Sequence, residues 1–134
     1  MASIFTKIVK GEIPCYKVAE SDDYLAFLDI RPLAVGHTLV IPKKEIDYIF
    51  DMEDDHLAGL MLFAKKVAKA MKPHVTCKRI GLSVIGLEVP HTHVHLVPIN
   101  KVDDITFGRP PVERTPEQQV VLAQAIHRTF LNIE

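Results

Sequence analysis

The segment from His91 to Val97 constrains the fold more than any other part of the sequence, because its residue types alternate with a period of two. Successive side chains of a β-strand point to opposite faces of a sheet, so this alternation predicts a strand over residues 92–99. One face carries His91, His93, His95 and Val97, and the other carries Thr92, Val94 and Leu96. We therefore expect three imidazoles on one surface of a sheet.

Four further segments have the composition of strands bounded by turn-forming residues. Residues 16–19 and 24–28 flank the sequence Ser21-Asp22-Asp23, which predicts a β-hairpin. Residues 37–42 are rich in β-branched side chains and end at a proline, so His37 is expected at the entrance of a strand. Residues 79–85 form the remaining run. Short connections between these strands, with helices outside their succession, predict an antiparallel sheet of about five strands.

A long helix and a short helix are predicted from apolar spacing. Between about Glu53 and Lys72 an apolar side chain recurs every three or four residues, which is typical of a helix that covers a sheet and ends before a proline. Near the N-terminus Ser3 is expected to cap a short helix that ends near Gly11. Its predicted apolar face consists of Ile4, Phe5, Ile8 and Val9.

The C-terminal part of the sequence predicts one more helix, which follows a polar, proline-bearing stretch. Thr115, Pro116 and Gln118 have the order of a capping box with proline at the first helical position. The helix should run to about Phe130 and present Leu122, Ile126 and Phe130. We predict a single α+β domain over residues 1–134, with a core over about 3–100 and a C-terminal extension over about 101–134.

Composition excludes several classes of protein. With 16 basic and 17 acidic residues the chain has a formal net charge of −1, so no broad basic surface for a nucleic-acid polymer is expected. Two cysteines do not make a disulfide framework, and no secretory signal or membrane-spanning run is recognised. These features predict a cytoplasmic protein without a membrane partner.

The clustered histidines allow two chemistries. In the first, a metal ion takes imidazole ligands; His91 and His95 have α-carbons about 13 Å apart on a regular strand, so a third ligand would have to come from His37 or a distant carboxylate. In the second, a neutral imidazole attacks phosphorus while its neighbours bind the phosphate oxygens. The isolated histidines, which are His56, His74 and His127, are expected to be structural.

The sequence resembles the histidine triad (HIT) superfamily, and most closely its nucleotide-binding branch. The resemblance lies in the triad segment 91–97 and in four segments that match in order, 4–9, 11–14, 27–30 and 36–43. It implies a small α+β domain with an antiparallel sheet, usually a homodimer, that hydrolyses or transfers nucleoside monophosphates. The implied substrate is a purine nucleotide, an AMP conjugate or a dinucleoside polyphosphate, and no cofactor or metal is implied.

The resemblance also assigns roles to residues. It implies that His93 is the nucleophile that forms a nucleotidyl-histidine intermediate, supported by His91, His95 and the separate His37. Asp29 would accept hydrogen bonds from the ribose hydroxyls. The base would lie in a slot lined by Phe5, Ile8 and Phe27.

Departures from the family pattern put the leaving group in doubt. Residues 86–90 read Gly-Leu-Glu-Val-Pro where relatives commonly have Gly-Gln-Ser or Gly-Gln-Thr. Glu88 in this place is expected either to turn away from the phosphate or to be protonated and donate its proton to the leaving group. Relatives that bind zinc have cysteines at positions that here resemble Ser3 and Thr6, and often a histidine at the position of Glu45. A structural zinc is therefore not expected.

Three hypotheses follow. The first is a hydrolase or transferase that acts through His93, and the second is a nucleotide-binding regulatory module that has lost the chemistry. The third is a metal-dependent hydrolase that uses His91, His93 and His37. In each of them, residues 107–110 are a hypothetical lid or partner-facing segment.

Overall fold

A computed structural model describes residues 2–133 of the chain. Its centre is a five-stranded sheet in the order β1-β2-β3-β5-β4, in which every neighbouring pair is antiparallel. The α+β prediction is confirmed. The elements are α1 (Ile4–Val9), β1 (Lys17–Glu20), β2 (Tyr24–Leu28), β3 (Thr38–Pro42), α2 (Asp54–Met71), β4 (Arg79–Ser83), β5 (Val94–Ile99) and α3 (Pro116–Leu131), with short 3₁₀ turns η1 (Ile49–Asp51), η2 (Lys72–His74) and η3 (Val102–Ile105).

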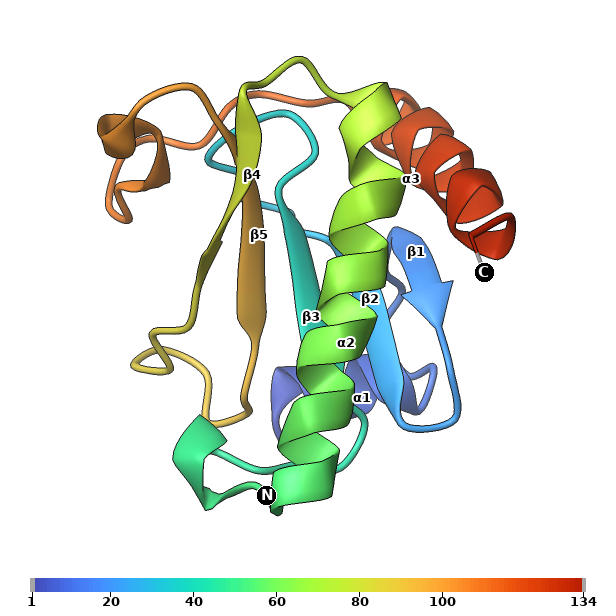
Figure 1. Ribbon diagram of the computed structural model, residues 1–134, viewed down its shortest axis with the longest axis vertical. Coiled ribbons are helices and arrows are strands. Elements are labelled where there is room, and N and C mark those ends of the chain that lie inside the picture. The colour runs from blue at the N-terminus through green and yellow to red at the C-terminus, as the bar shows by residue number, and fades with distance from the viewer. Residues whose placement is uncertain (1, 134) are drawn as a thin grey trace.

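Helices α2 and α3 cover one face of the sheet (Figure 1). The core between them contains the even-numbered side chains of β2, β3 and β5, including Leu28, Val40 and Leu96, together with Ile126 and Phe130 of α3. Both helices begin and end near the predicted residues. The capping box of α3 is formed, because Thr115 Oγ1 accepts from Gln118 N and Gln118 Oε1 accepts from Thr115 N.

Helix α1 lies on the opposite face of the sheet, where a smaller apolar cluster contains Phe5, Leu25, Phe27, Leu39 and Ile41. Ser3 caps this helix as predicted, since its Oγ accepts a hydrogen bond from Thr6 N at 3.0 Å. Ile4 was expected on the buried side, yet 47 % of its surface is exposed, because a six-residue helix turns only one narrow stripe toward the sheet.

Two strands, β5 and β4, are each two residues shorter than the sequence predicts, and β3 is one residue shorter, since it begins at Thr38. β5 begins at Val94 rather than Thr92, because Thr92 donates from both its N–H and its hydroxyl to the carbonyl of Ile46 in a loop instead of pairing with a strand. His91 and His93 therefore lie in the segment that leads into β5, and His95 is the only member of the triad within the regular strand. β4 ends at Ser83, which pairs with His95, so residues 84 and 85 belong to the following loop.

None of the helices within residues 2–133 is long and apolar enough to cross a membrane.

Candidate active site

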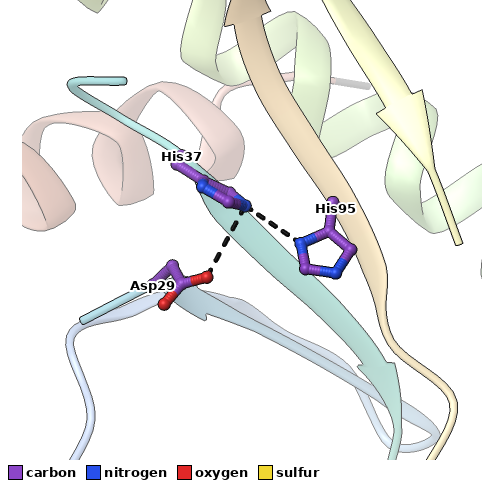
Figure 2. Close-up of side chains that lie close together, drawn as sticks. All are labelled: Asp29, His37 and His95. Atoms are coloured by element: carbon purple, nitrogen blue, oxygen red, sulfur yellow. Dashed lines mark hydrogen bonds and ion pairs between the residues drawn. The ribbon is translucent and has the colours of Figure 1, made fainter. Parts of the chain in front are cut away.

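A row of polar side chains crosses the sheet on the α1 side. His37 directly precedes β3, His95 lies on β5, and Asp29 directly follows β2 (Figure 2). The register pairs Phe27 with Leu39 and Leu39 with His95, so the odd-numbered residues of all three strands share this face. His37 Nε2 lies 3.0 Å from His95 Nδ1 and 3.6 Å from Asp29 Oδ2.

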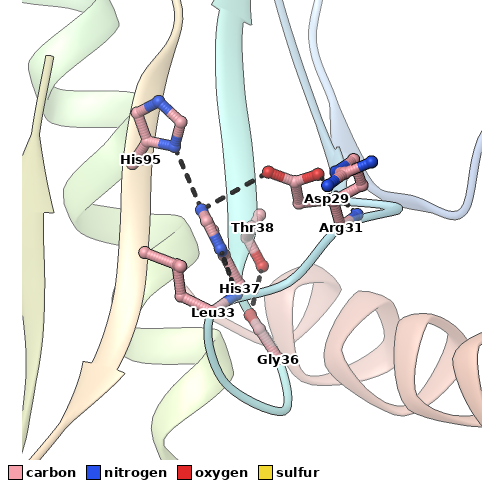
Figure 3. A network of polar contacts seen from close by, with 7 residues as sticks. All are labelled: Asp29, Arg31, Leu33, Gly36, His37, Thr38 and His95. Atoms are coloured by element: carbon pink, nitrogen blue, oxygen red, sulfur yellow. Dashed lines mark hydrogen bonds and ion pairs between the residues drawn. The ribbon is translucent and has the colours of Figure 1, made fainter. Parts of the chain in front are cut away.

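A backbone amide fixes the proton positions of this row. Leu33 N–H donates to His37 Nδ1 at 2.9 Å, so Nδ1 is an acceptor and the proton of the neutral ring is on Nε2 (Figure 3). His37 Nε2–H then donates to His95 Nδ1. The proton of His95 is consequently on its own Nε2, where it is available to donate to a bound group.

His93 has the opposite tautomer. Its Nδ1 lies 2.8 Å from the carbonyl oxygen of His91, and because a carbonyl only accepts, Nδ1 must be the protonated nitrogen. The lone pair of Nε2 is therefore free. The ring lies edge-on to Phe5 and to His95, with centroid distances of 5.1 and 5.0 Å. An imidazole whose Nδ1 donates to the backbone and whose Nε2 has no hydrogen-bond partner among residues 2–133 thus lies next to an imidazole N–H donor, an arrangement suited to attack on a group that His95 holds.

Both ring nitrogens of His91 form hydrogen bonds to groups outside this pair. Its Nε2–H donates to the carbonyl of Pro42 at 2.8 Å, and its Nδ1 accepts from the hydroxyl of Ser3 at 2.8 Å. Glu45 completes the cluster, since one of its oxygens accepts from Ser3 N–H and from the Thr6 hydroxyl, both at 2.6 Å. These hydrogen bonds hold the pKa of Glu45 at about 2. His91 therefore links α1 to the triad segment, and the backbone carbonyl of His91 orients the ring of His93.

Burial keeps three histidines of the site, His37, His91 and His95, neutral. Desolvation lowers the pKa of His37, His91 and His95, and for His95, flanked by two other imidazoles, it lowers the pKa to about 3. At neutral pH these three rings donate and accept hydrogen bonds without carrying charge.

A cavity of about 240 Å³ opens beside the row. It is lined by Asp29, Arg31, Leu33, His37, Glu88, His95, Phe107, Gly108, Arg109 and Pro111. A larger hollow of about 490 Å³ lies against α3, but its lining contains none of the triad residues. The chemistry of the side chains, rather than the volume, identifies the candidate site.

The three residues expected to line a slot for the base are buried or half-buried. Phe5 and Phe27 are 7 % and 4 % exposed, lie 5.7 Å apart and belong to the apolar cluster under α1, against which Ile8 packs. None of them lines the cavity of the polar row. Glu88 does line it and is exposed.

The structure does not bring together the metal ligands proposed from the sequence. Both ring nitrogens of His91 are engaged, by the Ser3 hydroxyl and the Pro42 carbonyl, and His93 has only Nε2 left. The cluster of ligand atoms found among residues 2–133 is instead Asp29, His37 and His95. A metal on His37 Nε2 would require the ring proton on Nδ1, where it would face the N–H of Leu33. This donor set therefore favours a hydrogen-bonded row over a metal site.

A sequence profile of the HIT domain matches residues 10–102. The chain belongs to the HIT domain family. Among relatives of this HIT protein, the adenosine 5'-monophosphoramidase hnt1 of Schizosaccharomyces pombe is 38 % identical over 128 residues, which are 94 % of this chain and 96 % of the yeast protein. A HIT-like protein from Bartonella henselae, described as involved in cell-cycle regulation, has a crystal structure that matches with a TM-score of 0.82, 31 % identity and 95 % coverage of both chains.

A zinc-bound histidine triad family protein from Mycobacterium smegmatis also has this fold, with a TM-score of 0.81, 26 % identity and coverage of 98 % of this chain and 94 % of that one. The residues of the present HIT protein at the positions that zinc-binding relatives use are Ser3, Thr6 and Glu45, and hydrogen bonds join them to His91 in a cluster of four. Two of the four are hydroxyls, and the cluster is closed by hydrogen bonds of 2.6 to 2.8 Å. Ligand atoms around a tetrahedral zinc lie about 3.3 Å apart and are thiolates, imidazoles or carboxylates. The cluster does not fit zinc.

Sequence reasoning missed two sets of residues in this HIT protein. The amide of Leu33 has no signal in the sequence, because any residue type supplies an N–H. Arg31 and Pro111 join the cavity through chain folding alone. Phe107, Gly108 and Arg109 were singled out only as a hypothetical lid, and they line the cavity.

Proposed function

We propose that this HIT protein is a hydrolase that releases a nucleoside 5'-monophosphate, AMP in the first place, through a nucleotidyl intermediate on His93. The observation that carries the proposal is the free Nε2 of His93 beside the N–H of His95. The yeast relatives named adenosine 5'-monophosphoramidase, 38 % and 43 % identical, support a nucleotide substrate.

The reaction proceeds in two displacements. The lone pair of His93 Nε2 attacks the phosphorus, and a P–N bond forms as the bond to the leaving group breaks, with the departing atom taking a proton from solvent or from Glu88. Water then attacks the phosphorus and gives one proton to solvent, the P–N bond breaks as its electron pair returns to Nε2, and AMP and the free His93 ring are released. Throughout, His95 Nε2–H donates to a non-bridging phosphate oxygen, and His37 holds that proton in place. Neither step requires a metal.

The remaining assignments follow the same proposal. Asp29 Oδ1 accepts from Arg31 N–H at 2.9 Å, which fixes the carboxylate and leaves its other oxygen for a ribose hydroxyl. Phe5, Ile8 and Phe27 would contact the base. We also propose a homodimer and a cytoplasmic location: β4 is an edge strand with Leu82 47 % exposed, and Cys15 and Cys77 are free.

The test uses purified chain, adenosine 5'-phosphoramidate and excess chelator, with AMP release followed by chromatography. The unaltered chain should turn over, and His93→Ala should lose activity by a factor of 10³ or more while still binding AMP, since a removed nucleophile has no substitute. His56→Gln, which removes a histidine from α2 outside the site, is the matched control and should retain activity. Turnover by His93→Ala, or complete inhibition by chelator, would refute the mechanism.

The second candidate is a binding module without chemistry. It is favoured by Leu87, which is 88 % exposed, and Glu88, which take the place of a polar pair in relatives. AMP binding by the unaltered chain without release of AMP from a phosphoramidate or a dinucleoside polyphosphate would establish this alternative.

A further inference from the structure

The ends of the strands supply the cavity of the active site with a carboxylate but with no cation. Asp29 lines the cavity, and the imidazoles of His37 and His95 are neutral at pH 7 because burial lowers their pKa. A phosphate that enters carries at least one further negative charge. The sheet itself supplies hydrogen-bond donors but no cation, so the charge of the phosphate must be balanced by groups from elsewhere.

The cations that line the cavity are two arginines. Arg31 lies two residues after Asp29, and within residues 2–133 its guanidinium has no hydrogen bond or ion pair to another side chain (Figure 3). Arg109 comes from a different part of the chain and is 48 % exposed. Its Nη1 donates to the carbonyl of Asp103 at 2.6 Å and lies 3.8 Å from Asp104 Oδ1.

Arg109 belongs to a strap, which we define as residues 106–111, between η3 and α3. The strap is anchored at both ends. Before it, Asp104 Oδ2 accepts from the N–H groups of Asn100 and Lys101, and Ile105 packs over Gly81 of β4. After it, Val112 N–H donates to the carbonyl of Pro32. Between these anchors every residue of the strap is exposed.

The strap lies against the reactive face. The Phe107 ring is edge-on to His95 with a centroid distance of 4.5 Å, and lies 6.5 Å from His37. Gly108 follows with φ = +102°, a conformation that side-chain-bearing residues rarely adopt, and it turns the chain so that Arg109 also lines the cavity. The strap is thus the wall of the site that the sheet does not provide.

We propose that Arg109 is a substrate-binding residue that, together with Arg31, binds the phosphate oxygens of a nucleotide, and that Phe107 is the contact between the strap and the triad. This inference deepens the proposed hydrolase function and rests on the same site. It assigns to the strap the recognition of the anionic part of the substrate, leaving the nucleoside to Asp29 and the apolar cluster under α1. A guanidinium suits this role, because its planar fork matches two phosphate oxygens.

The binding experiment compares AMP with adenosine by calorimetry on the full chain. Arg109→Gln should weaken AMP binding about ten- to a hundredfold and leave adenosine binding unchanged, with Arg109→Lys between the two. Arg128→Gln, the same change on the exposed side of α3, is the matched control and should bind both ligands as the unaltered chain does. Equal weakening of AMP and adenosine by Arg109→Gln, or no weakening of AMP, overturns the proposal.

A second variant reports on the strap directly. The chain contains no tryptophan, so Phe107→Trp introduces a single tryptophan, excited selectively over the three tyrosines, at the contact with His95. Saturating AMP should shift its emission, whereas adenosine should shift it less; an emission spectrum that AMP leaves unchanged overturns the contact. Both experiments measure binding, so a chain that binds AMP in this way but releases none from a phosphoramidate would refute the hydrolase function and leave the assignment of Arg109 standing.

Discussion

The buried row of histidines predicts a specific loss of stability in mild acid. His95 has a pKa of about 3 in the folded chain, chiefly because burial penalises its charged form, against an ordinary value of 6.5. The unfolded chain therefore binds a proton at this ring below pH 6.5, while the folded chain does not until about pH 3. Stability is fully present above pH 6.5 and is lost as the pH falls through the range from 6.5 to 3.

The magnitude follows from linkage. Between pH 7.5 and pH 5 a single such histidine lowers the free energy of unfolding by about 2 kcal/mol, at a limiting slope of about 1.4 kcal/mol per pH unit. His37 and His91 shift in the same direction and add to the loss. The variant His95→Gln largely keeps the shape and volume of the site and removes one titrating ring. The slope of its free energy of unfolding against pH should therefore lack the contribution of one proton.

The assay is urea unfolding of the unaltered chain and of His95→Gln at pH 5, 6 and 7.5. The variant should lose about 2 kcal/mol less than the unaltered chain between pH 7.5 and pH 5, whatever its stability at pH 7.5. His56→Gln, outside the row, should retain the full pH dependence. Equal pH dependence in His95→Gln and the unaltered chain would show that His95 is not held neutral by the fold.

Two further predictions concern stability. Ile126→Ala should lower the free energy of unfolding by about 2–5 kcal/mol in urea, because Ile126 is fully buried between α3 and the sheet; a loss below about 1 kcal/mol would mean that α3 does not complete this core. Ser3→Ala removes the cap of α1 and the hydroxyl that donates to His91, so a loss of about 1–2 kcal/mol is expected, with faster hydrogen exchange in α1. Unchanged exchange of the α1 amides would contradict the role given to Ser3.

The sequence by itself determined the elements of this protein and their order. Alternation near His95 predicts a strand, the spacing from residue 53 to 72 predicts α2, and Thr115 with Gln118 predicts the start of α3. These patterns succeed because each depends on residues a few positions apart, whose geometry is fixed by strand and helix periodicity. The same local reasoning extended the strand to Thr92, where a hydrogen bond to a distant loop overrides it.

Only the tertiary structure decided what each histidine does. The alternation makes His91, His93 and His95 equivalent, yet His91 is bound by Ser3 and by the Pro42 carbonyl, 88 and 49 residues away in the chain. His37 Nδ1 accepts a hydrogen bond from the Leu33 N–H, so the proton of His37 is on Nε2. That proton is donated to His95, which lies 58 residues further along the chain. The protonated nitrogen of an imidazole is set by its hydrogen-bond partners, and those partners meet only when the chain folds. The same holds for Arg109, whose place beside the triad depends on the path of the strap across the sheet.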